Sequence, residues 1–141
     1  MSAFQDLLQQ YVDMPYDELL KTANQNMDYF IGDIQQKFGT QDGNGFVAVL
    51  IGVCLGIDAK LTELENKFLN DVTGAKNSYA ENLKFVQQAN TEVARKLVED
   101  VVRRLPKKTR ATICSFCLCF FAVDETVSKE EIAFLERLLA D

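Results

Sequence analysis

Four carboxylate side chains recur in two pairs along the sequence: Asp58 with Glu65, and Asp124 with Glu131. In each pair the glutamate follows its aspartate by seven positions, and the second pair repeats the first at an offset of 66 residues. Carboxylate oxygens are the ligands preferred by hard divalent cations such as Mg²⁺, Ca²⁺ and Mn²⁺. If folding brings the two pairs together, they form one or two acidic sites for such a cation.

The same positions also fit a structural interpretation as helix-start signals. Thr62 precedes Glu65 by three residues, and Ser128 precedes Glu131 by three. This Ser/Thr-x-x-Glu spacing is a capping box, in which hydroxyl and carboxylate each accept a hydrogen bond from a backbone amide of the first turn. Each aspartate would then satisfy amides of the preceding turn. The two interpretations are compatible, because a capping glutamate can still present one oxygen to a cation.

The chain has four cysteines, and two of them, Cys114 and Cys117, have the C-x-x-C spacing of zinc and redox sites. The sequence has no histidine and no second such pair, so a tetrahedral zinc site cannot be completed. We expect Cys54, Cys114, Cys117 and Cys119 to pack in the core as small hydrophobic side chains. Free cysteines also suit a reducing compartment, which predicts a cytoplasmic location.

Catalytic motifs are missing from the sequence. Without histidine there is no default acid–base group, and neither a nucleophile elbow nor a phosphate-binding glycine loop is found. We therefore expect no catalytic residue and no enzyme activity. A carboxylate-metal enzyme is the alternative, since a pair of carboxylates can perform acid–base chemistry.

Charge is unevenly distributed along the chain. The segment 95–110 contains seven basic and two acidic residues, a net charge of +5, whereas the whole chain is −6 and the remainder therefore −11. Such an acidic protein is not a general nucleic-acid binder. The basic segment is either a solvated helix end or a docking patch for an acidic partner, which would make the protein a structural adaptor.

The spacing of apolar residues predicts one all-α domain over residues 1–141, with no membrane span, because the longest apolar runs are too short. Seven helices are expected, at 2–12, 16–38, 45–57, 62–72, 78–105, 108–123 and 129–140. The segment 40–45, rich in glycine and asparagine, is expected to be a loop. The domain is thereby divided into N-terminal helices (1–44), a first repeat (45–74), a long helix (75–105) and a second repeat (106–141).

The repeat extends beyond the acidic pairs. Residues 56–69 align with 122–135 over 14 positions without a gap. In this alignment Phe68 and Leu69 correspond to Phe134 and Leu135. Each copy reads as an apolar helix, a tight turn and a capped second helix. Two such helix–turn–helix units can pack about a pseudo-twofold axis, each burying the apolar face that the other cannot bury alone.

These motifs resemble those of the TerB-like family, the helical domain of tellurite resistance. The resemblance rests on Asp58 with its capping box and on Asp124 with its own, and it covers about 95 residues from Phe46 onward. It implies a helical module associated with tellurite resistance and stress responses, which binds a protein partner or a divalent cation through paired acidic turns, with a homo-oligomer possible. The family pattern has glycine after each aspartate, whereas this chain has Ala59 and Glu125, so the turn geometry is expected to differ.

Overall fold

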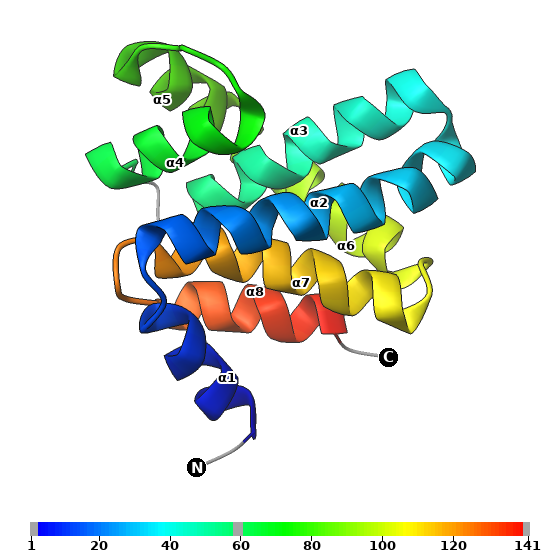
Figure 1. The fold of residues 1–141 in the computed structure, drawn as a ribbon. Coiled ribbons are helices and arrows are strands. Elements are labelled where there is room, and N and C mark those ends of the chain that lie inside the picture. The colour runs from blue at the N-terminus through cyan, green and yellow to red at the C-terminus, as the bar shows by residue number, and fades with distance from the viewer. Residues whose placement is uncertain (1–2, 58–60, 140–141) are drawn as a thin grey trace.

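The computed structural model describes residues 3–57 and 61–139, and this part of the chain is built from helices without any strand. Figure 1 shows their arrangement: α1 (Ala3–Val12), α2 (Tyr16–Phe38), α3 (Thr40–Gly56), α4 (Glu63–Thr73), α5 (Tyr79–Ala89), α6 (Glu92–Arg103), α7 (Lys107–Ala122) and α8 (Lys129–Leu139). The predicted all-α class is confirmed. The described residues contain eight helices, one more than the seven that the sequence predicted.

The extra helix arises because the predicted long helix 78–105 is interrupted. Asn90 leaves the helical conformation with φ −82° and ψ 69°. The Thr91 side chain then caps a new helix by accepting a hydrogen bond from the Ala94 amide at 3.1 Å. The sequence contains this signal, a threonine directly before Glu92, but helix-forming residues on both sides conceal it.

The predicted loop at 40–45 is wrong, because these residues form the start of α3. Gly39 turns the chain between α2 and α3 with φ +89°, a conformation that favours glycine. Gly43 lies against α2, where a Cβ atom would be 3.1 Å from the Cα atom of Gln35. Glycine here permits close packing of two helices, and its presence does not indicate a loop.

Helix α7 lies at the centre of the bundle. It packs along α2 and also contacts α1, α3, α4, α6 and α8, while α3 packs between α2 and α5 (Figure 1). This central position explains why α7 is mostly apolar after its first turn and not amphipathic. Within the described residues, no helix combines the length and apolar character that crossing a membrane requires.

A row of aromatic rings joins three helices through the core. Phe30 of α2 meets Phe116 of α7 edge to face at 5.2 Å between centroids, and Phe116 meets Phe120 at the same distance. Phe120 in turn meets Phe68 of α4 at 5.0 Å. All four side chains are fully buried. Edge-to-face ring pairs stabilise the fold beyond the effect of burial alone. This row therefore ties α4 to the centre of the bundle.

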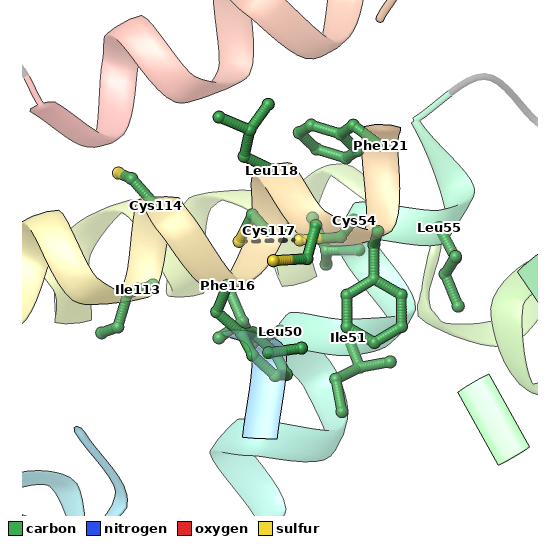
Figure 2. Close-up of a cluster of buried hydrophobic side chains, with 14 of the residues drawn as sticks. Leu50, Ile51, Cys54, Leu55, Ile113, Cys114, Phe116, Cys117, Leu118 and Phe121 are labelled. Carbon is green, nitrogen blue, oxygen red and sulfur yellow. Dashed lines mark hydrogen bonds between the residues drawn. The ribbon is translucent and has the colours of Figure 1, made fainter. Parts of the chain in front are cut away.

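The cysteines lie in the core, as expected. All four are free and buried, and the Cys54 and Cys117 sulfur atoms are 3.0 Å apart, joining α3 to α7 (Figure 2). Burial raises the pKa of the Cys119 thiol to about 12 and raises the pKa of Cys117 and Cys114 well above the usual thiol value. These thiols are therefore neutral, and they act as packing groups.

Candidate functional site

The start of α4 has the predicted capping box. The Thr62 hydroxyl accepts a hydrogen bond from the Glu65 amide at 3.1 Å, and the Thr62 amide donates to Glu65 Oε1 at 2.9 Å. The Glu65 side chain is buried as a consequence. The preceding residue, Leu61, is also buried, and its carbonyl accepts a hydrogen bond from the Tyr79 hydroxyl of α5. Leu61 is thus held by its buried side chain and by the hydrogen bond of its carbonyl to α5.

The start of α8 repeats this arrangement. The Ser128 amide donates to Glu131 Oε1 at 2.8 Å, and the Glu131 amide donates to the Ser128 hydroxyl at 3.1 Å. Glu131 is buried, like its counterpart in α4. The capping interpretation of the sequence is therefore confirmed for both repeats.

A hydrogen bond joins the starts of the two capped turns. The Thr62 hydroxyl, which accepts from the Glu65 amide, donates its own proton to the Asp124 carboxylate, with both Asp124 oxygens at 2.9 Å. The turn that follows α7 is thereby held against the cap of α4. The sequence predicted that Asp124 accepts hydrogen bonds from turn amides, whereas the donor found here is a hydroxyl of the other repeat. The corresponding aspartate of the first repeat, Asp58, lies outside the described residues.

The turn after Asp124 has an unusual backbone. Glu125 has φ +67°, in the left-handed region that glycine adopts freely, and its amide donates to the Ala122 carbonyl at 2.8 Å. A non-glycine residue there costs roughly 1–2 kcal/mol. The backbone of Glu125 therefore has a φ value that glycine adopts freely, although the glycine of the family pattern is absent, and the expected difference from the family's turn geometry stays a prediction. The second departure, Ala59, lies outside the described residues.

Described residues of both repeats border an open hollow of about 840 Å³. It is bordered by four carboxylates, three hydroxyls and three apolar side chains: Glu65, Asp124, Glu130, Glu131, Thr62, Thr126, Ser128, Ile57, Phe121 and Val127. Three of the four residues predicted as metal ligands therefore border one hollow. The sequence analysis did not identify Glu130 or Thr126 as part of the site. The only sequence signal for them is position: Glu130 lies within the second capping box, and Thr126 lies two residues before it.

Helix geometry accounts for much of the acidic lining. The first turns of α4 and α8 each contain two glutamates, the position where a carboxylate stabilises the helix dipole. Asp124 differs, because it follows the C-terminus of α7, where a negative charge is unfavourable. The carboxylate of Asp124 is thus the one in the hollow that neither a capping box nor the helix dipole explains.

The described residues alone do not form a metal centre. Among them, no group of three or more acidic or cysteine side chains is placed to hold a metal ion. Glu65 and Glu131 each commit one oxygen to a backbone amide. The predicted metal set of Asp58, Glu65, Asp124 and Glu131 therefore stays a prediction. What the hollow does offer is four carboxylates beside three apolar side chains.

Comparisons of the chain with protein-family models, with curated proteins and with solved structures give no match.

Proposed function

We propose that this protein is a non-catalytic, TerB-like helical module of the tellurite-resistance and stress-response type. Its acidic hollow would bind a cationic group, either the side chain of a protein partner or a divalent cation. The observation that carries the proposal is the single hollow of about 840 Å³ to which both repeats contribute carboxylates. Approximate twofold symmetry between the repeats belongs to the same proposal, and it is supported by the matching capping boxes.

The lining of the hollow favours a cationic side chain with an apolar stem. Phe121 and Val127 line it together with Asp124 and Glu130. A lysine or arginine can lay its methylene groups on apolar surface while its charged end reaches a carboxylate. The hollow is therefore suited to the end of a basic segment. A divalent cation is the second form of the proposal, because carboxylates and hydroxyls also suit hard ions.

The two forms can be separated by titration. Calorimetry with Mg²⁺, Ca²⁺ and Mn²⁺ tests the cation form, and NMR titration with a tri-arginine peptide tests the side-chain form. The proposal expects saturable binding of at least one probe, with amide shift changes around residues 61–65 and 123–131. Tri-glutamate peptide serves as the matched negative control for the peptide measurement.

Variants locate the binding. Asp124→Asn removes the one lining charge that neither capping nor the helix dipole explains, and it should weaken binding at least tenfold. Asp42→Asn is the control, because this exposed aspartate lies in the first turn of α3, at the far end of that helix from the hollow. Binding that survives Asp124→Asn, or a failure of all four probes to bind, would overturn the proposal.

A further inference from the structure

Seven of the eight described helices have an acidic residue in their first turn, as the helix dipole favours, and α7 is the exception. Its first turn contains Lys107 and Lys108, and no side chain caps it. At its other end, Asp124 and Glu125 follow the last turn. Both groups of charges add to the partial charges of the helix instead of cancelling them, so the two ends of α7 are strongly and oppositely polarised.

The positive end of α7 gathers further cations. Arg103 and Arg104, just before the turn, are exposed like Lys107 and Lys108. Lys37 of α2 joins them, since its ammonium group donates to the Arg104 carbonyl at 2.9 Å. Within the described residues, none of these five cations, which we call the basic pole, makes an ion pair.

Two carboxylates lie near the five cations of the basic pole. Asp33 is half-buried and accepts a hydrogen bond from the Thr109 hydroxyl at 2.6 Å, and Asp100 lies on α6 one turn before Arg103. The basic pole is thus an exposed surface with an excess of positive charge. A shallow depression of about 200 Å³ lies in it, and its lining includes Lys37, Pro106 and Asp33.

The acidic hollow lies at the opposite end of the same helix. Because α7 has 16 residues, the two ends are roughly 24 Å apart at 1.5 Å per residue. Figure 1 shows this separation, with the α6–α7 turn at one side of the bundle and the α7–α8 turn at the other. Since the two surfaces lie on opposite sides, one molecule cannot bring its own basic pole to its own hollow.

We propose that the basic pole of one molecule docks in the acidic hollow of a second copy of this chain. The inference rests on the proposed function, because it names the partner for the same hollow. Two surfaces of opposite charge at opposite ends make a head-to-tail contact, which adds further copies until the chain of molecules closes or stops. The cationic side chains that would enter the hollow are those of Lys107 and Lys108, which are adjacent and exposed in the first turn of α7. The Lys108 ammonium group lies 5.5 Å from the centroid of the Tyr29 ring, so it would leave this ring on docking.

The contact should be weak and sensitive to salt. Ion pairs between exposed groups are screened within about 8 Å at physiological ionic strength, and the net charge of −6 on each molecule opposes association. Sedimentation velocity should therefore show an average mass above the 15.9 kDa monomer at high protein concentration and about 20 mM salt. The mass should return to that of the monomer at about 0.3 M salt.

Two charge reversals test the pairing. Lys107→Glu/Lys108→Glu reverses the basic pole and should keep the fold, because acidic residues suit the first turn of a helix. Glu125→Lys/Glu130→Lys reverses one charge that lines the hollow, Glu130, and one in the adjacent turn, Glu125, and both residues are exposed. Each variant alone should associate at least tenfold more weakly than the unchanged chain, and an equal mixture should recover association, since each supplies the surface that the other has lost.

Several results would overturn the inference. A monomer at low salt and high concentration would exclude self-docking, as would association that persists in either variant or that the mixture fails to recover. The tri-arginine titration separates this failure from that of the proposed function. If the peptide binds the hollow while the chain stays monomeric, the hollow keeps its function and the second copy is the wrong partner.

Discussion

The two repeated units start their second helices in the same way but build their first helices differently. In α3 the contact face includes Gly52 and Gly56, where an added Cβ atom would lie 2.4 Å from Ala89 Cβ and 2.8 Å from Asn90 Cβ. At the matching positions α7 has the larger side chains of Leu118 and Ala122. The repeat therefore preserves the local signal that begins a helix. The helices packed against each unit differ, and they determine which side-chain size fits at each core position.

The second helices are also anchored differently. Asn82 of α5 is buried and donates to Asn66 at 2.7 Å and to Asn70 at 3.0 Å, both on α4. Helix α8 instead forms a surface ion pair, Arg137 to Glu99 of α6, at 2.6 Å. A buried amide cluster depends on every member having its partner, whereas an exposed ion pair contributes little. The first unit is therefore expected to tolerate fewer polar substitutions than the second.

The largest effect should come from the aromatic row of the second unit. Phe120→Ala removes a fully buried ring with two edge-to-face partners and should reduce the free energy of unfolding by about 3–5 kcal/mol. Cys54→Ala, at the equivalent position of the first unit, should reduce it by only about 1 kcal/mol. Urea unfolding measures both, and equal losses would contradict the difference between the two cores.

Alkaline pH should destabilise the fold through the thiols. Because burial raises the folded-state pKa of Cys114, Cys117 and Cys119, their contribution is complete below the unfolded thiol pKa and is lost as pH rises. Above about pH 9 each thiol should cost about 1.4 kcal/mol of unfolding free energy per pH unit. Urea unfolding under a reductant measures this slope. Cys119→Ala should make it shallower by one thiol, and an unchanged slope would contradict the assignment.

The close packing of the first unit can be tested at its glycines. Gly52→Ala places a methyl group against Ala89 and should reduce the free energy of unfolding by about 1–3 kcal/mol. Gly45→Ala lies in the same helix with no neighbour within 4 Å of the added atom, so it should raise stability by about 0.5–1 kcal/mol. Thermal unfolding distinguishes the two, and a stabilising Gly52→Ala would refute close α3–α5 packing.

The two capping boxes should contribute similar free energies of unfolding. Removing the Thr62 cap should cost more, because its hydroxyl also bridges the two units. Ser128→Ala should cost about 1 kcal/mol of unfolding free energy. Thr62→Ala should cost about 1–2 kcal/mol, because it also removes the hydrogen bond to Asp124. Thr62→Ser is the control and should restore most of the loss. Equal losses for the two alanine variants would show that the bridge contributes nothing.

The smallest effect is expected at the turn of the second unit. Glu125→Gly relieves a left-handed backbone but increases the entropy of the unfolded chain, so a net gain of about 0.5–1 kcal/mol is expected. Glu125→Ala keeps the unfavourable conformation and is the matched control. If both variants have the same midpoint of thermal unfolding, the conformation of residue 125 carries no cost.

Much of the candidate site could be predicted from sequence, because capping is local. The hydroxyl of Thr62 and the carboxylate of Glu65 are three residues apart, so their hydrogen bonds form wherever the helix forms. The bond from Thr62 to Asp124 spans 62 residues, and no local pattern contains it. Glu130 was missed for the same reason, since only the meeting of the two turns makes it part of a hollow.

The sequence by itself determined the all-α class, the starts of α4 and α8 and the burial of the cysteines, because apolar periodicity and capping act within a few residues. Tertiary structure decided where the chain departs from local expectation. Helix α3 begins at Thr40 because Gly43 lets it pack against α2. Helices α5 and α6 separate at Asn90, where the chain lies against Gly56 of α3. Close approach between helices depends on contacts between residues distant in sequence. The structural roles of Gly43 and Asn90 can therefore be recognised only in the folded chain.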